Sequence, residues 1–257
     1  MSAPVFMADP AVLAAAAPGA TLAVTGPDAR HAVTVVRMRT GEPIELVDGI
    51  GRRVRGEVVT ATAPDHLVVA VDAVVDEPAP APRLVVAQAI AKGDHGELAV
   101  DLMTQVGVDA IVPWQAARSV ARWTDEKAER ARSKWRDTAV QAAKQSRRAR
   151  VPLIGAPVGL AGLCALVRAS ASSIVLHEQA ETSVLDLTLP VEGDLILVIG
   201  PEGGIADDER AALAAAGARE AVLGPTVLRS SLAGAVALTV LGARLRWGVP
   251  GMEGSGA

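Results

Sequence analysis

Short apolar stretches interrupted by polar residues dominate the first third of the chain. Each stretch is rich in β-branched residues and is bounded by Gly, Asp or Pro, a pattern that is typical of short strands joined by turns. The stretches that predict strands are ATLAVTG, EPIELVDG, RRVRGEVVTATA and DHLVVAVDAVV. We expect residues 1–76 to form a small β-barrel.

A proline-rich stretch separates this region from the rest of the chain. Prolines occupy alternate positions of DEPAPAPR, at 78, 80 and 82. Proline fixes φ and cannot donate a backbone hydrogen bond, which favours extended chain over helix or central strand. We therefore expect a linker at 77–83, a second domain at 84–249 and a flexible tail at 250–257.

In the second domain, apolar runs of strand length alternate with segments of helical periodicity. Strands are expected at 84–90, 110–113, 174–176, 195–199 and 221–223. Helices are expected near 94–106, 124–148, 160–169, 207–216 and 232–246. Apolar strands joined by helical crossovers predict an α/β fold, in which helices cover both faces of a parallel sheet. Ligands of such sheets bind beyond the carboxyl ends of the strands.

Two of the expected helices carry a packing signal. Trp135 shares a helical face with a row of alanines, which indicates a core position rather than a base-stacking one. The last helix contains LAGAVALTVLGA and is apolar around its whole circumference. It must therefore be buried on most sides.

The composition excludes several classes of site and location. Cys164 is the only cysteine and the four histidines show no ligand spacing, so we expect neither a disulfide framework nor a bound metal. The N-terminus lacks the basic segment of a signal peptide. The longest uncharged apolar segment, Leu232 to Ala243, is shorter than the roughly 20 residues of a membrane span. We expect a soluble, cytoplasmic protein with no membrane partner.

Basic residues are concentrated in one segment, although the net charge is −4. Between Arg118 and Arg150 there are eleven Lys and Arg against four acidic residues. The stretch 144–150 contains four cations and no acid, which suits phosphate contacts that position a nucleic acid without reading its sequence. Cations also favour the C-terminus of a helix, so a solvated helix end is the alternative.

Two of the expected strands end in similar loops. Strand 195–199 leads into Gly-Pro-Glu-Gly-Gly at 200–204, and strand 221–223 leads into Gly-Pro-Thr-Val-Leu-Arg at 224–229. Glycines allow the backbone to approach a ligand, and neither loop matches G-x-x-x-x-G-K-[ST] or G-x-G-x-x-G. We expect the two loops to form one pocket. A tight strand-to-helix turn is the alternative interpretation of the first loop.

Arg229 stands where the last helix is about to begin. A cation is unfavourable there unless an anionic partner compensates, because the helix N-terminus carries partial positive charge. Arg229 is therefore a candidate for binding an anionic group, with an ordinary surface arginine as the alternative.

The sequence IGPEGG, followed at a short distance by LGPTVLR, closely resembles the RsmE family, the small-subunit (16S) ribosomal RNA uridine-N3 methyltransferases of the SPOUT superfamily. The resemblance extends along nearly the whole chain. The further segments that carry it are HAVTVVRMRTGEPIELVDG, AIAKGD, VGVDAIVPWQAARSV, KWRDTAVQAAKQSRRARVP and LHE.

This resemblance implies a PUA-like, RNA-binding β-barrel in 1–76, a SPOUT α/β domain with a trefoil knot in 84–249, and a homodimer. It implies S-adenosylmethionine as cofactor and small-subunit ribosomal RNA or the assembled small ribosomal subunit as substrate. The cofactor-binding residues it implies are Leu176, His177, Glu178, Ile199, Gly200, Pro201, Glu202, Gly203, Gly204, Leu223, Gly224, Pro225, Val227, Leu228, Arg229 and Ser230. In the last helix it implies subunit packing through Gly234, Ala237, Leu238 and Leu241, with core burial within the single chain as the alternative.

Two residues are candidates for catalysis. Methylation of uridine N3 requires alignment of the reacting atoms and removal of the N3 proton. Glu202 is the carboxylate nearest the expected pocket and is the candidate proton acceptor, with a turn residue that bonds backbone amides as the alternative. Arg229 is the candidate for orienting the uracil or phosphate, or for stabilising the developing uracil anion.

Two positions near the pocket depart from the family pattern. The residues after the arginine are Ser-Ser-Leu-Ala at 230–233, where the family commonly has Thr-Glu-Thr-Ala. A role for that glutamate cannot be carried over. Ala206 replaces the usual serine helix cap, which leaves Glu209 or Asp207 to bond the start of the helix.

Candidate RNA-binding residues lie in both domains. They are His31, Arg37, Arg39 and Arg52 in the expected barrel, and Arg118, Lys144, Arg147, Arg148 and Arg150 in the second domain. Ordinary strand-face charge is the alternative for the first group. With no Tyr and one Phe, the chain does not predict an aromatic sheet that stacks bases.

Two other functions remain open at this point. The glycine-rich turns after parallel strands also suggest a dinucleotide-dependent oxidoreductase, but the G-x-G-x-x-G fingerprint is missing. A non-catalytic module that binds the ribosome or RNA is the other alternative, and the altered loop at Ser231 supports it.

Overall fold

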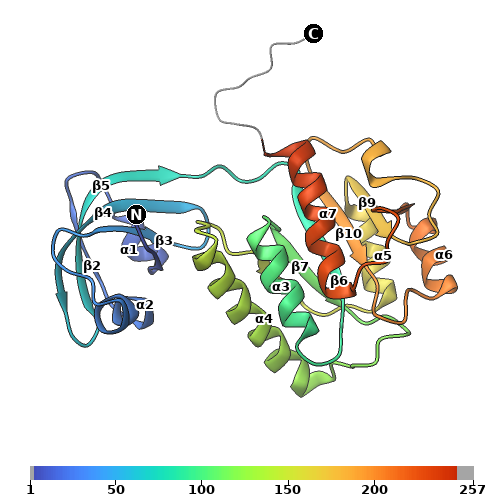
Figure 1. Ribbon diagram of the computed structural model, residues 1–257, viewed down its shortest axis with the longest axis horizontal. Helices are drawn as coiled ribbons and strands as arrows, with labels where there is room; N and C mark the ends of the chain where they lie inside the picture. Colours follow the sequence, from blue (N-terminus) through green and yellow to red (C-terminus); the bar gives the residue numbers. More distant parts are fainter. Residues whose placement is uncertain (1–2, 248–257) are drawn as a thin grey trace, which may run out of the picture. The chain divides into compact units, whose positions relative to one another are not determined.

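The computed structural model describes residues 3–247, apart from the side chains at 125 and 126. The chain forms two compact units, drawn in Figure 1. The N-terminal unit contains the residues up to Ala79 together with Val140–Val151, and the C-terminal unit contains Pro80–Ala139 and the residues from Pro152 onwards. The tail expected at 250–257 lies outside the described residues.

The N-terminal unit is built on a five-stranded sheet with the strand order β1-β3-β4-β5-β2. The strands are β1 (Val5–Met7), β2 (Thr21–Val24), β3 (Pro43–Val47), β4 (Arg52–Thr62) and β5 (His66–Asp76). Its helical elements are α1 (Pro10–Ala14), α2 (Pro27–Arg30) and a π-helix at His31–Val36. The four stretches expected as strands thus form β2 to β5. Alternate residues of β4 and β5 are buried in one core, as their apolar alternation predicted.

The segment Val140–Val151 belongs to the N-terminal unit because its residues bond there. Lys144 Nζ lies 2.5 Å from Asp28 Oδ1, and the Arg53 guanidinium donates a hydrogen bond to the backbone carbonyl of Arg147. Ala149 is fully buried in a small apolar cluster of this unit. Sequence analysis placed the whole segment in 84–249, because its helical pattern continues from the preceding residues. The division into units differs from that boundary.

The C-terminal unit contains a six-stranded sheet in the order β11-β9-β10-β6-β7-β8. Its strands are β6 (Arg83–Ala89), β7 (Ala110–Trp114), β8 (Leu153–Ile154), β9 (Ser172–Leu176), β10 (Asp194–Ile199) and β11 (Arg219–Ala221). Every neighbouring pair is parallel, which confirms the expected parallel sheet. Strand β11 ends two residues earlier than predicted, because the N–H of Val222 bonds Thr182 outside the sheet.

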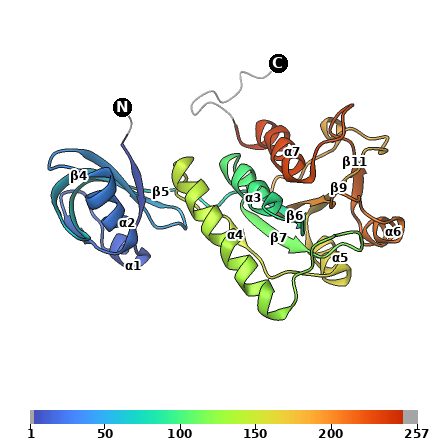
Figure 2. The ribbon, with the colours of Figure 1, turned by 60° about the horizontal axis from the view of Figure 1, so that its bottom comes forward.

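Helices cover both faces of this sheet, as predicted (Figure 2). They are α3 (His95–Gln105), α4 (Asp125–Gln145), α5 (Leu160–Ala169), α6 (Asp207–Ala215) and α7 (Ser230–Leu245), with a short 3-10 turn at Val184–Asp186. Helices α5 and α6 share one apolar cluster with the sheet, whereas α3 and α7 pack on each other on the opposite face. Among the described residues, no helix combines the length and the apolar character needed to cross a membrane.

The four small and apolar residues implied as a subunit surface in α7 are buried within the chain itself. Ala237, Leu238 and Leu241 have no exposed surface. Gly234 lies so close to α3 that a Cβ there would come within 2.6 Å of Met103 Sδ. These positions serve the core between α3 and α7, which corrects the implied subunit packing.

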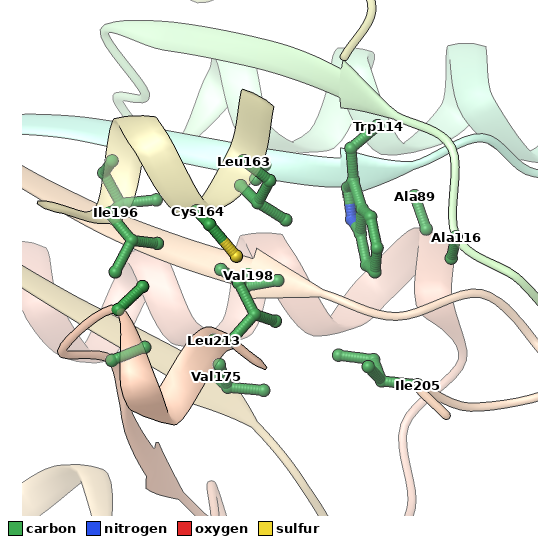
Figure 3. Close-up of a cluster of buried hydrophobic side chains, with 14 of the residues drawn as sticks. Ala89, Trp114, Ala116, Leu163, Cys164, Val175, Ile196, Val198, Ile205 and Leu213 are labelled. Atoms are coloured by element: carbon green, nitrogen blue, oxygen red, sulfur yellow. The ribbon is translucent and has the colours of Figure 1, made fainter. Parts of the chain in front are cut away.

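Two buried tryptophans fix the helices and strands near the ends of the sheet. Figure 3 shows Trp114 among Ala89, Ala116 and Ile205. Its indole Nε1 donates a 3.0 Å hydrogen bond to the carbonyl of Ile199, the last residue of β10. Trp135 is also buried and packs against α3, which confirms its expected place in the core.

Candidate active site

A cavity of about 770 Å³ lies at the carboxyl ends of the parallel strands of the C-terminal unit. Its wall consists mainly of the residues that follow β9, β10 and β11, which are neighbours in the sheet. The start of α3 after β6 and the loop after β7 complete the wall with His95 and Arg118. A cavity of this size and place is typical of small-molecule sites in α/β proteins.

The two Gly-Pro loops line this one cavity, as the sequence predicted. All the residues expected to bind the cofactor contribute to its wall, with the exception of Pro225. Pro225 is exposed, and only its neighbours Gly224 and Thr226 line the cavity at this point. A Cβ at Gly224 would meet no protein atom within 4 Å, so the space beside this backbone is open.

The first loop is held in a tight turn. The N–H of Gly204 donates to the carbonyl of Pro201 at 2.9 Å, and Gly204 has a φ of +73°, which a side chain would disfavour. Gly203 lies beside the loop after β7, where a Cβ would come within 3.2 Å of Arg118 Cβ. The glycines therefore serve both the turn and the close approach of the two loops.

A buried chain of hydrogen bonds links the two Gly-Pro loops to the centre of the sheet. Gln88 in β6 is fully buried, and its Nε2 donates to Ser230 Oγ at 3.0 Å. Ser230 in turn donates to the carbonyl of Gly200 at 2.7 Å. These hydrogen bonds hold the start of α7 against the end of β10, and thereby fix the width of the cavity between them.

Glu209 replaces the missing side-chain cap of α6. Its carboxylate accepts hydrogen bonds from the N–H of Ala206 at 3.1 Å and from the N–H of Ala117 at 2.8 Å. The side chain is almost completely buried. Of the two substitutes considered for the absent serine, Glu209 is therefore the one that bonds the helix start, and it also anchors the loop after β7.

An ion pair supports the floor of the cavity. Arg210 of α6 donates from Nε and Nη2 to the two carboxylate oxygens of Glu220, each at 2.7 Å. These hydrogen bonds lower the pKa of Glu220 below its ordinary value, against the opposing effect of burial. Arg210 lines the cavity, and its bonds to Glu220 hold the guanidinium in a fixed position there.

Arg229 and Glu202 bring charge of opposite sign to the cavity. Arg229 is the N-cap residue of α7, and its guanidinium makes no hydrogen bond or ion pair within the described part of the chain. Glu202 is half-exposed, and its Oε1 lies 3.4 Å from Nδ1 of His95. An unpaired arginine at a helix N-terminus is available to an anionic ligand.

Sequence reasoning missed several residues of the cavity. His95, Asp207 and Arg210 line it, and Gln88 supports it from below. His95 was set aside because the histidines lack metal-ligand spacing, but its place at the start of the helix that follows β6 could have identified it. Within residues 3–247, apart from the side chains at 125 and 126, no group of His, Cys, Asp or Glu is arranged to hold a metal ion.

The predicted RNA-binding residues fall into different environments. His31, Arg37 and Arg39 are exposed on the N-terminal unit, whereas Arg52 is bound to Asp76 through two hydrogen bonds, which raise its pKa. Arg118 lines the cavity and donates to the carbonyl of Gly203.

The cations at the end of α4 are partly engaged in holding the N-terminal unit together. Lys144 pairs with Asp28, and the Arg150 guanidinium bonds the carbonyls of Ile50 and Glu77. Arg148 also has a partner. Arg147 is exposed and has a left-handed backbone, with φ of 57°.

Comparison with known proteins identifies the family. The family model described as an RNA methyltransferase domain matches residues 77–242, and that of an RNA methyltransferase PUA domain matches 24–71. A Mycobacterium bovis protein named ribosomal RNA small subunit methyltransferase E is 43% identical over 228 residues, which cover 87% of each chain. This chain belongs to the ribosomal RNA small subunit methyltransferase E family. The methyltransferase match thus covers most of the C-terminal unit, and the PUA match lies within the N-terminal unit.

More distant members of the ribosomal RNA small subunit methyltransferase E family agree. The Bacillus subtilis protein of that name is 29% identical over 86% of this chain and 89% of its own. Among solved structures, a Legionella pneumophila protein described as a methyltransferase in complex with SAM is 26% identical, with a TM-score of 0.82, and the match covers 95% of this chain and 98% of that one.

Proposed function

We propose that this protein transfers a methyl group from S-adenosylmethionine to N3 of a specific uridine in small-subunit (16S) ribosomal RNA. The observation that carries the proposal is one cavity, formed by two Gly-Pro loops at neighbouring strand ends, with the unpaired guanidinium of Arg229 at its wall. Membership of the ribosomal RNA small subunit methyltransferase E family supports the same chemistry.

The cavity suits S-adenosylmethionine in both size and chemistry. Residues 200–204, 223, 224 and 226–228 line much of the wall, and their backbone groups can bond the polar edges of the adenine and the amino acid part. Glu178 offers a carboxylate for hydroxyl or amino groups, while Leu176 and Ile199 offer apolar surface. When bound, S-adenosylmethionine supplies a methyl group carried on a positively charged sulfur.

The remaining catalytic work falls to polar side chains of the cavity. The N3–H of uracil must lose its proton, and the negative charge that develops on the ring must be stabilised. Arg229 is free to bond a carbonyl oxygen of the uracil or a neighbouring phosphate. Glu202 places a carboxylate at the same cavity and takes part in removing the proton.

Binding of the RNA is assigned to exposed cations. Arg37 and Arg39 carry guanidinium groups that make no hydrogen bond or ion pair within the described residues, and His31 is exposed beside them on the π-helix. Such side chains suit phosphate contacts. Arg147 and Arg118 add charge in the other segments, whereas the paired Arg52 and Lys144 contribute less.

The proposal includes the architecture usual for this chemistry. It comprises a closed PUA-like barrel, a trefoil knot around the cavity, and a homodimer. The insertion of β10 between β6 and β9, and the hydrogen bond between Ser230 at the start of α7 and Gly200 after β10, support the knot. Exposed Leu98 on α3 and Leu232 on α7 support an association through this face.

The experiment that tests the proposed function is methyl transfer in vitro. Purified protein is incubated with labelled S-adenosylmethionine and small subunits that lack the modification, and the digested nucleosides are separated. We expect label in N3-methyluridine. Binding of the subunits without any transfer of label would favour the non-catalytic module instead, and label in another nucleoside would contradict the assignment to N3.

A further inference from the structure

His95 and Glu202 form a pair at the wall of the cavity. His95 is the first residue of α3, which follows β6, and Glu202 lies in the loop after β10. Their Nδ1 and Oε1 atoms are 3.4 Å apart, both side chains are about half-exposed, and both line the cavity. Two neighbouring strands of the sheet thus bring an imidazole and a carboxylate to one place.

The contact determines which ring nitrogen carries the proton. An ionised carboxylate only accepts hydrogen bonds, so a neutral imidazole that bonds it through Nδ1 must have its proton on Nδ1. The lone pair then lies on Nε2, the opposite nitrogen of the ring. A carboxylate in this position orients the imidazole and holds it in this tautomer.

We propose that Nε2 of His95 accepts the N3 proton of the uracil, and that Glu202 positions the imidazole for this step. This inference rests on the proposed function. The N3–H bond breaks, its electron pair stays on N3 of the uracil, and the proton goes to the Nε2 lone pair. The imidazolium then passes the proton to water, which restores the neutral ring.

The tautomer of His95 is the first test, and it requires no activity. Nitrogen NMR of the protein labelled in its histidines distinguishes protonated from unprotonated ring nitrogens, and His95→Gln identifies the signals of His95. We expect the proton on Nδ1 in the wild type and a redistribution towards Nε2 in Glu202→Gln. A proton on Nε2 in the wild type would overturn the proposal.

Kinetics with a more acidic substrate provides the second test. Because fluorine at C5 withdraws electrons from the ring, 5-fluorouridine at the target has a more acidic N3–H and needs a base less. We expect His95→Gln to slow single-turnover transfer to uridine by about 10²–10⁴-fold, with a smaller loss on 5-fluorouridine and unchanged binding of S-adenosylmethionine by calorimetry. An equal loss on both substrates would mean a structural role.

Two further variants complete the design. His95→Asn keeps a donor that can reach Glu202 but removes the basic Nε2 lone pair, so we expect it to be as slow as His95→Gln. His66→Gln changes an exposed histidine of β5 outside the cavity and should retain the wild-type rate. If the wild type makes N3-methyluridine and His95→Gln makes it equally fast, only the role of His95 is refuted. If the wild type methylates another atom, the proposed function itself is wrong.

Discussion

The hydroxyl of Ser230 donates a 2.7 Å hydrogen bond to the carbonyl oxygen of Gly200. These residues open α7 and the loop after β10, which are the two sides of the cavity. Because Gln88 donates to the same hydroxyl from the centre of the sheet, the cavity rests on a buried polar contact as well as on apolar packing. A polar group in this environment is costly to leave without a partner.

Substitution of Ser230 by alanine should therefore weaken both the fold and the cofactor site. Ser230→Ala leaves the Gly200 carbonyl and the Gln88 amide without this bond. We expect a loss of about 1–3 kcal/mol in the free energy of unfolding, together with weaker binding of S-adenosylmethionine by calorimetry. Ser133→Ala, at an exposed position of α4, is the matched control. Equal stability of the two variants would show that the bond contributes nothing.

Arg229 should affect the reaction much more than the cofactor. Arg229→Met keeps a long side chain but removes the guanidinium, which stabilises charge on the uracil or binds a phosphate. We expect kcat/KM for the RNA to fall by about 10²-fold or more, with little change in the affinity for S-adenosylmethionine. Arg168→Met, which replaces an exposed arginine of α5, serves as the control. If Arg229→Met loses only its binding of S-adenosylmethionine, this role of Arg229 in the reaction is wrong.

The exposed cations of the N-terminal unit should determine the salt dependence of RNA binding. Each phosphate contact contributes about one unit to the slope of log affinity against log salt concentration. We expect the double variant Arg37→Ala and Arg39→Ala to reduce this slope by about two, measured by filter binding at several salt concentrations. Arg168→Ala should leave the slope unchanged. If the double variant has the same slope as the wild type, the RNA phosphates do not contact Arg37 and Arg39.

Acid should weaken the C-terminal unit through Glu220. Its pKa is lower in the folded protein than the ordinary value of 4.5, chiefly because Arg210 donates two hydrogen bonds to it. A carboxylate of this kind stabilises the fold above its unfolded-state pKa, and the stabilisation disappears as the pH falls through the folded-state pKa.

Glu220→Gln tests this dependence. We expect the variant to unfold at lower urea concentration at pH 7, and to lose less stability than the wild type between pH 5 and the acid limit. Glu192→Gln removes an exposed carboxylate and should follow the wild-type curve. Parallel curves for Glu220→Gln and the wild type would show that the ion pair does not contribute.

Much of the fold could be predicted from the sequence because its signals are local. The apolar runs of β6 and β10 and the Gly-Pro loops that follow β10 and β11 are continuous stretches of chain. Parallel strands place their carboxyl ends at one edge of a sheet. The cavity and nearly all of its expected lining follow from these two facts.

The remaining features depend on partners that are distant in the sequence. Glu202 and His95 are 107 residues apart, and Ser230 and Gln88 are 142 residues apart. No periodicity or spacing connects such pairs. The buried position of Gly234 against Met103 likewise requires knowledge of which helix lies beside α7, and without it an apolar helix suggests a subunit interface equally well.

The most direct test of the central claim is reverse transcription across 16S ribosomal RNA from cells that lack this protein. N3 methylation blocks Watson–Crick pairing, so the reverse transcriptase stops at the modified uridine. We expect one strong stop in wild-type cells that disappears in the deletion strain, returns with the wild-type protein and stays absent with Arg229→Met. An unchanged pattern of stops in the deletion strain would contradict methylation of N3 by this protein.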